Sequence, residues 1–148
     1  MTDPRIAEAV ELFEEVLVYG TERLLRTVDN PIWDEYSREQ IQVLKLIAKE
    51  GSLTSRRLAS LQAVHKSAVS IRIKKLLSNE LIRIVESKDK REKLLELTSA
   101  GHEIVRQSNH VLSEYLQHLM TDRIDDVEFE QFLLLFRKLR TIMKMEEV

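Results

Sequence analysis

The sequence has no cysteine, and it holds only three glycines, two prolines and 5% aromatic residues among 148 positions. The absence of cysteine excludes disulfides, thiolate metal sites and thiol redox chemistry. The shortage of glycine and proline disfavours a turn-rich β-sandwich and predicts a mostly helical fold. No apolar run approaches the roughly 20 residues of a membrane span, and the first ten residues lack the pattern of a signal peptide. We therefore expect a cytoplasmic protein with no membrane partner.

Catalytic motifs are missing as well. The chain has no glycine-rich phosphate loop, no cysteine nucleophile and no serine with a matching histidine and acid. The acid pairs Asp125-Asp126 and Glu146-Glu147 lie at the ends of predicted helices, where capping and solubility explain them. We predict that the protein is not an enzyme and carries no cofactor.

Positive charge, in contrast, is concentrated in one stretch of the chain. Residues 54–93 hold eleven Lys/Arg against four Asp/Glu, a balance of +7. The other residues hold twelve against twenty-one, a balance of −9, so the net charge of −2 conceals a polarised molecule. Local positive charge on a short helical stretch is typical of a surface that binds a phosphate backbone.

The apolar spacing before this block predicts two helices. From Pro4 to about Val28, apolar side chains recur every three or four residues along one stripe. A second helix begins after Ser37, which forms a capping-box pattern with Gln40, and ends near Gly51. The stripe of the first helix consists of Ile6, Val10, Phe13, Leu17, Leu24 and Val28.

Inside the block, the pattern predicts a winged helix. A short helix from Thr54 to Leu61, the link 62–64 and a basic helix over 65–79 together form a helix-turn-helix pattern. Two β-leaning runs, LIRIVES and KLLELT, then predict a hairpin. The inner face of the basic helix consists of Val69, Ile73, Leu76 and Leu77.

After the hairpin, Thr98 is predicted to cap a helix that reaches about Met120, and a last helix begins at Asp125. The terminal helices carry more apolar surface than the small centre can cover, so a second copy of the chain is the expected partner. The predicted fold is mostly α with a small β-hairpin wing. Its regions are an N-terminal dimerisation segment (1–36), a winged helix-turn-helix (37–100) and C-terminal dimerisation helices (101–148).

The basic helix has one face that can meet DNA. At 100° per residue, the face opposite Val69 and Ile73 carries small hydroxyls near the helix start, followed by lysines. Hydroxyls allow the backbone to approach closely, and lysines reach phosphates. Ile71 is the odd member of this face, and a thymine methyl in the major groove fits it. The predicted DNA-binding residues of this helix are Lys66, Ser67, Ser70, Ile71, Lys74 and Lys75.

Two neighbouring segments extend this surface. The residues predicted to bind phosphate on the short helix are Thr54, Arg56 and Arg57. The predicted wing residues are Lys88, Asp89, Lys90 and Arg91. A solvated face would explain the lysines of the basic helix alone, whereas cations crowded at a hairpin tip favour double-stranded DNA as the partner. An arginine extended from a wing suits the negative potential of a narrow minor groove.

Two motifs in this region stand in a fixed relative order. The first consists of Leu53-Thr54, Leu58-Ala59, Val64, Lys66-Ser67, Val69-Ser70 and Leu76. The second is Asp89-Lys90-Arg91, seven residues before Leu97-Thr98, with Gly101 three residues beyond. With this order and spacing, residues 53–101 resemble the winged-helix core of the MarR family of bacterial transcription regulators.

The resemblance implies a homodimer joined through the N- and C-terminal helices. Such a dimer would bind a palindromic operator whose half-sites lie about one helical turn apart. The resemblance further implies that Arg91 enters the minor groove and that Asp89 pairs with it. We expect a repressor whose DNA binding is modulated by a small effector of unknown identity.

Three positions depart from the family pattern. His65 stands where the family commonly has serine, which predicts weaker capping of the basic helix. Ile71-Arg72 reverses the common basic-then-apolar order. Asn79-Glu80 replaces the usual lysine-glycine before the strand, which predicts an altered helix end.

Other sites and functions stay open at this point. Phe13, Trp33 and Tyr36 are candidates for a small-molecule cleft, although Trp33 also suits a purely structural role in the loop between the first two helices. His110, Glu114 and His118 recur every four residues on one helix face, so a metal-responsive regulator is one alternative. A winged-helix module that binds an acidic protein partner is another.

Overall fold

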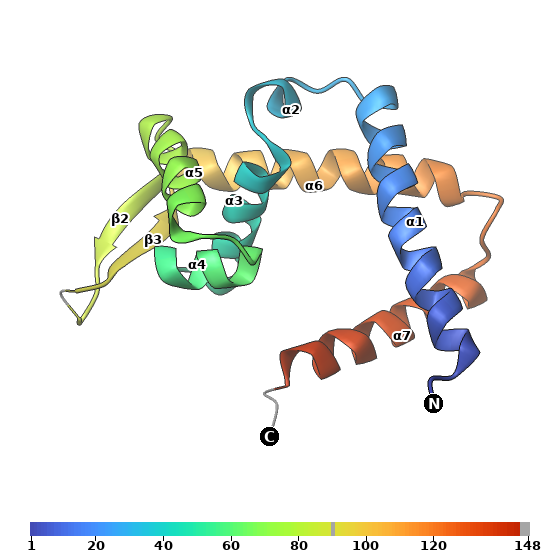
Figure 1. Cartoon of the computed structure of the whole chain (residues 1–148). Helices are drawn as coiled ribbons and strands as arrows, with labels where there is room; N and C mark the ends of the chain where they lie inside the picture. Colours follow the sequence, from blue (N-terminus) through green and yellow to red (C-terminus); the bar gives the residue numbers. More distant parts are fainter. Residues whose placement is uncertain (90, 146–148) are drawn as a thin grey trace. The chain divides into compact units, whose positions relative to one another are not determined.

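The computed structural model describes residues 1–89 and 91–145 as seven helices and three strands (Figure 1). The chain divides into two compact units, residues 1–111 and 112–148, and the boundary falls inside α6. The elements are α1 (Pro4–Thr27), α2 (Pro31–Glu35), α3 (Arg38–Glu50), β1 (Leu53–Thr54), α4 (Ser55–Gln62), α5 (Lys66–Ser78), β2 (Ile82–Glu86), β3 (Lys93–Leu97), α6 (Ser99–Met120) and α7 (Asp126–Lys144).

Local capping explains where α3 begins and ends. The Gln40 N–H donates to the Ser37 hydroxyl at 3.1 Å, and the Ser37 N–H donates to Gln40 Oε1 at 2.9 Å, so the predicted capping box is formed. Gly51 ends the helix at φ 84°, a left-handed conformation that favours glycine. The same kind of box, from Asp125 and Glu128, starts α7. Both helix starts were predicted, whereas the short helix α2 was not.

A single apolar core holds together the segment that we call the winged head, residues 31–105. Sixteen buried hydrophobic residues form one cluster, drawn from α2 and its C-cap, α3, α4, α5, the link before β2, the sheet strands and the start of α6. The most deeply buried side chains of this cluster are fully enclosed, at 0% exposure, so each contributes close to its full transfer free energy. These side chains are Val43, Leu44, Ile47, Leu58, Val69 and Leu76.

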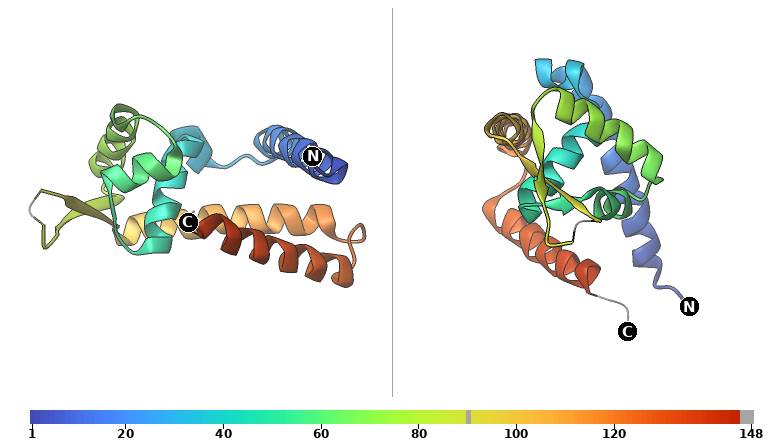
Figure 2. Two further views of the ribbon diagram at one scale, coloured as in Figure 1. Left: turned by 60° about the horizontal axis from the view of Figure 1, so that its bottom comes forward. Right: turned by 90° about the vertical axis from the view of Figure 1, so that its left-hand side faces the viewer.

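The sheet is small and antiparallel, with strand order β1-β3-β2. The predicted hairpin of β2 and β3 pairs Ile82 with Leu97 and Glu86 with Lys93, and it projects from the helices of the winged head (Figure 2). The third strand, β1, was not predicted. Leu53 of β1 pairs with Leu95 of β3, which ties the base of the wing to the residues that precede α4.

The start of α6 lies against the hairpin at a point where only glycine fits. The Gly101 N–H donates to the Thr98 hydroxyl at 3.1 Å, which caps the helix as predicted. A Cβ added to Gly101 would lie 2.1 Å from the carbonyl oxygen of Leu81. Close packing of α6 on the winged head therefore depends on this glycine.

Farther along α6, hydrogen bonds from Arg106 and Gln107 lower the pKa of the exposed Glu103 carboxyl to about 2.

The terminal helices differ from the winged head because neither α1 nor α7, both described in full, contains a buried residue. Large apolar side chains such as Phe13, Leu17 and Phe132 are about half exposed. Among residues 1–89 and 91–145, no helix has the length and apolar character needed to cross a membrane. The apolar surface of α1 and α7 therefore lacks cover within the described structure.

Candidate nucleic-acid interface

The helix-turn-helix is formed by α4 and α5 and a short tight link. Ala63 ends α4 in the left-handed conformation, at φ 52°. His65 then starts α5, because its side-chain Nδ1 accepts the Ser67 N–H at 3.3 Å and lies 3.0 Å from the Ser67 hydroxyl. His65 thus takes the capping position at the start of α5, through a hydrogen bond slightly longer than the usual range.

The outward face of α5 carries the predicted mixture of hydroxyl, lysine and apolar groups. Val69, Ile73 and Leu76 are buried on the inner face. The exposed residues of α5 are Lys66, Ser67, Ser70, Ile71, Lys74 and Ser78. Five of the six residues predicted to bind DNA through this helix therefore lie together on its solvent side.

Lys75, the sixth predicted residue, lies elsewhere. It is partly buried, its ammonium donates to the carbonyl oxygen of Glu35, and Nζ stands 5.2 Å from the centre of the Tyr36 ring. Asn79 continues this contact, since its Nδ2 donates to the Tyr36 hydroxyl at 2.8 Å. The C-terminal end of α5 is thus fastened to the segment around α2, and a DNA contact of Lys75 stays a prediction.

Arg72 has a role inside the winged head that its sequence position did not reveal. Its Nη1 donates to Gln62 Oε1 at 2.7 Å. The Gln62 amide in turn donates to the carbonyl of Glu39 and to Gln42 Oε1, both at 2.9 Å. This chain of hydrogen bonds joins α5 to α4 and α3, so the Arg72 guanidinium is directed toward Gln62 of α4.

The start of α4 places cations beside the helix-turn-helix. Thr54 caps the helix, because its hydroxyl accepts the Arg57 N–H at 3.1 Å. Its own O–H remains a donor, since a hydroxyl can donate and accept at once. Arg56 and Arg57 are exposed, as a phosphate-binding role requires.

The wing turn between β2 and β3 is organised by Ser87, a residue that was not predicted to have a role. The Ser87 hydroxyl accepts the Asp89 N–H at 3.1 Å and donates to the Glu92 carbonyl at 2.8 Å. Asp89 Oδ1 accepts the backbone N–H of Arg91 at 3.1 Å, so the contact is to the main chain and not to the guanidinium. A serine at the junction of a strand and a polar loop is the signal that could have identified this turn.

The predicted wing residues occupy this turn. Lys88, Asp89 and Arg91 are exposed, and Lys90 lies outside the described residues. Asp89 bonds to the main chain of Arg91, so it does not orient the Arg91 guanidinium. The Arg91 side chain is exposed in the turn of the hairpin.

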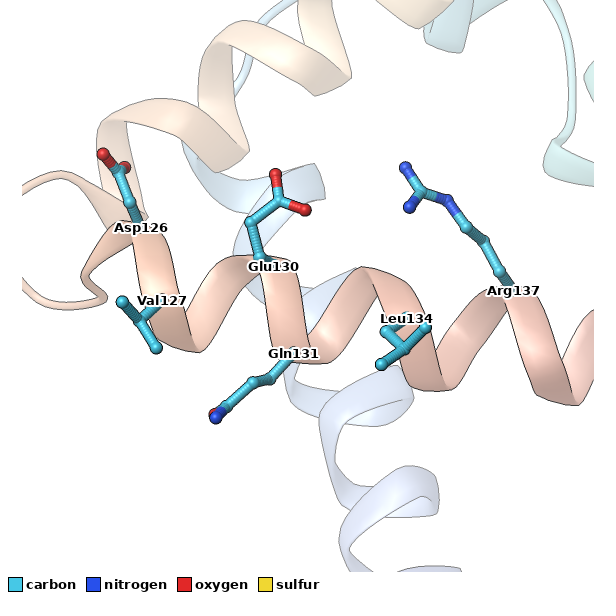
Figure 3. Close-up of a pocket in the computed structure, with 6 residues that line it drawn as sticks. All are labelled: Asp126, Val127, Glu130, Gln131, Leu134 and Arg137. Atoms are coloured by element: carbon cyan, nitrogen blue, oxygen red, sulfur yellow. The ribbon is translucent and has the colours of Figure 1, made fainter.

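The three candidates for a ligand cleft do not share one environment. Tyr36 is buried in the core at 7% exposure, Trp33 packs against the same core, and Phe13 is 54% exposed on α1. A shallow, open hollow of about 490 Å³ lies along α7, where the side chains of Glu130 and Arg137 rise from the same side of the helix (Figure 3). Its described lining residues, Asp126, Val127, Glu130, Gln131, Leu134 and Arg137, all belong to α7. No ligand is assigned to a surface formed by one helix.

His110, Glu114 and His118 are exposed on α6. Across the part of the chain that the structure describes, no group of three or more His, Asp or Glu side chains is arranged to hold a metal ion. The geometry therefore adds no support to the metal-responsive alternative.

The helix-turn-helix with its basic outward face and β-hairpin wing defines a winged helix-turn-helix protein of the DNA-binding class. Solved structures share this fold, among them two MarR proteins. A MarR family protein from Bacillus stearothermophilus matches with a TM-score of 0.78 at 20% identity, over 98% of this chain and 99% of that one. Staphylococcus aureus MarR, solved in complex with salicylate and kanamycin, matches with a TM-score of 0.72 at 23% identity, over 95% of each chain.

Sequence comparison gives the family. The model of the MarR family matches residues 36–93. The HTH-type transcriptional regulator YdgG of Bacillus subtilis (strain 168), itself uncharacterized, is 33% identical over 147 residues, which cover 97% of this chain and 96% of that protein. The chain belongs to the MarR family and is an HTH-type transcriptional regulator, not an enzyme.

Proposed function

We propose that the protein is a homodimeric repressor that binds a palindromic operator and is modulated by a small effector. One observation carries the proposal, namely that cations from three elements are exposed on a single winged head. They are Arg56 and Arg57 of α4, Lys66 and Lys74 of α5, and Arg91 of the wing. Such a distribution fits phosphate contacts on both sides of a helix that enters the major groove.

The residues of α5 support a base-contacting role for its outward face. Ser67 and Ser70 are small and exposed, so the N-terminal half of the helix can approach base edges closely. Lys74 follows one turn later and reaches toward the backbone. Arg91 is exposed in the wing turn, and the negative potential of a narrow minor groove would attract its guanidinium.

The uncovered surfaces of α1 and α7 support a second copy as the partner. Their apolar stripes repeat at intervals of three and four residues, which suits packing between helices. Their charges are complementary too. Acidic residues gather in the first half of α1 (Glu8, Glu11, Glu14 and Glu15), and basic residues gather in the second half of α7 (Arg137, Lys138, Arg140 and Lys144). Attraction between these halves favours antiparallel packing of α1 from one copy with α7 from the other.

DNA binding is tested by mobility shift with a fragment from upstream of the protein's own gene. We expect affinity to fall steeply with salt, and Arg91→Ala and Lys74→Ala each to weaken binding and to lower the salt slope by about 1. Lys49→Ala removes an exposed lysine of α3 and serves as the control. Unchanged binding by both interface variants would refute this assignment of the surface.

Repression and effector control need separate measurements. Transcription in vitro from the bound promoter should fall as protein is added, and a rise would indicate activation. Salicylate is the probe for effector binding, because the similar Staphylococcus aureus MarR was solved with it. We expect salicylate to weaken the complex with DNA, and an unchanged complex would exclude this compound as an effector.

A further inference from the structure

Ile71 is the one large apolar side chain exposed on α5, a helix that the structure describes in full. Its exposure is 70%, and it lies on the outward face between Ser67, one turn before it, and Lys74, about one turn after it. A large aliphatic group held in water at this position gains nothing from the fold of the single chain. The exposure of Ile71 at the centre of the face predicted to meet base edges therefore needs a physical explanation.

The surroundings of Ile71 do not suit a protein partner. Its neighbours on the outward face are hydroxyls and lysines, not further apolar groups. The other large apolar side chains exposed within residues 54–89 and 91–93, Leu61 and Ile84, belong to α4 and β2 and not to α5. An isolated apolar group ringed by cations is too small for a protein interface. It matches a polyanion that displays small apolar groups.

Duplex DNA has one such group in the major groove, the C5-methyl of thymine. The phosphates on either side of the groove would meet Lys66 and Lys74, while the hydroxyls of Ser67 and Ser70 leave room for the aliphatic side chain to approach a base. The charge and the shape of this face of α5 therefore both favour duplex DNA as its partner.

The residue next to Ile71 is withdrawn from the same surface. Arg72 is partly buried, and its guanidinium donates to Gln62, which is bonded in turn to Glu39 and Gln42. The basic member of the Ile71-Arg72 pair thus acts within the protein, whereas the apolar member faces outward. The hydrogen bonds also fix α5 against α4 and α3, and so fix how far Ile71 reaches.

We propose that Ile71 is a specificity-determining residue that recognises a thymine methyl, and that Arg72 is a positioning residue that acts through Gln62. The inference rests on the proposed function, because it requires α5 to lie in the major groove. It goes further by naming the base that is recognised. Thymine would be distinguished from cytosine at one position of each half-site, because cytosine has no methyl there.

The test uses a duplex that the wild-type protein selects from a random library. Each thymine is replaced in turn by uracil, which removes only the methyl group. We expect one position in each half-site at which the replacement weakens wild-type binding about fourfold, the value for one buried methyl. Ile71→Ala should bind thymine and uracil duplexes equally, and Ile71→Val should keep most of the preference. Ile84→Ala, an equal truncation at an exposed site on β2, should leave the preference unchanged.

The outcomes separate the two levels of the proposal. A wild-type protein that binds the selected duplex but tolerates uracil everywhere overturns the role of Ile71 and leaves the proposed function standing. Failure to select any duplex overturns both. For Arg72, we expect Arg72→Ala and Gln62→Ala to reduce the methyl preference equally, with no further loss in the double variant and an unchanged salt slope. A lower salt slope for Arg72→Ala alone would mean a phosphate contact and would refute the positioning role.

Discussion

The winged head buries its apolar residues, whereas the terminal helices α1 and α7 expose theirs. In the winged head, sixteen hydrophobic residues form one buried cluster, whereas α1 and α7 contain no buried residue. Both kinds of helix begin with well-formed caps, for example at Ser37 and at Asp125. Capping therefore determines where a helix starts, and it does not indicate whether the helix has found its packing partner.

The largest effect is expected from a charge placed in the apolar stripe of α7, which consists of Phe129, Phe132, Leu133, Phe136, Leu139 and Met143. Phe132→Asp should convert the proposed dimer to monomers, because a buried carboxylate without a partner costs several kcal/mol in each copy. Analytical ultracentrifugation measures this change, and circular dichroism should show that the winged head stays folded. Gln131→Asp adds the same charge outside the stripe and should leave the dimer intact. A Phe132→Asp variant that remains dimeric would place the interface elsewhere.

A matched pair of glycine substitutions sharpens the contrast. Gly101→Ala should destabilise the protein by about 3 kcal/mol, since the new methyl would clash with the Leu81 carbonyl. Gly20→Ala in α1 has no heavy atom within 4 Å of the added Cβ, so it should stabilise the isolated chain by about 1 kcal/mol. Thermal unfolding of both variants checks the pair. If Gly20→Ala is destabilising instead, a second copy approaches α1 closely at this point.

A smaller loss is expected where α5 is fastened to the α2 segment. Asn79→Ala and Tyr36→Phe each remove the hydrogen bond between these residues and should each cost about 1 kcal/mol of the free energy of unfolding. Urea denaturation of the two variants and of the double variant gives their coupling. Effects that simply add would mean that this bond does not hold the winged head together.

The smallest change concerns backbone strain at the end of α5. Glu80 has φ 57°, the left-handed region, so Glu80→Gly should relieve strain and stabilise the protein by less than about 1 kcal/mol. Glycine also gains freedom in the unfolded chain, which limits the benefit. Thermal unfolding measures the change, with Glu86→Gly in β2 as a control that should be destabilising. A destabilised Glu80→Gly variant would mean that the Glu80 side chain contributes more than its strain removes.

Much of the fold follows from local patterns in the sequence. The long helices, the capping box of Ser37, the helix start at Asp125 and the hairpin were predicted, because apolar periodicity and capping residues act over a few positions. The short helix α2 and the Ser87 turn are local features that were missed, and the other missed features join distant residues. The β1 strand depends on the pairing of Leu53 with Leu95, and the position of Lys75 depends on its contact with Glu35, forty residues away. Periodicity on one element does not contain this information.

The interface was predictable to a similar degree. Helical geometry placed the outward face of α5 on the correct residues, including Ile71. It placed Lys75 on the flank of this face, but it did not show that Lys75 contacts Glu35 or that Arg72 is bonded to Gln62, because those contacts come from neighbouring elements. The DNA contacts of all these side chains, and the three predicted regions of the chain, stay predictions.

The pairing of β1 with β3 has a consequence for how the chain folds. Leu53 can pair with Leu95 only after the forty-one residues between them have closed a loop. Closing this loop costs chain entropy, so the pairing forms late. Contacts between distant residues slow folding. During synthesis, α1 leaves the ribosome with its apolar stripe uncovered before the sheet can form. The order of the elements therefore sets an interval in which the apolar stripe of α1 is exposed on the growing chain.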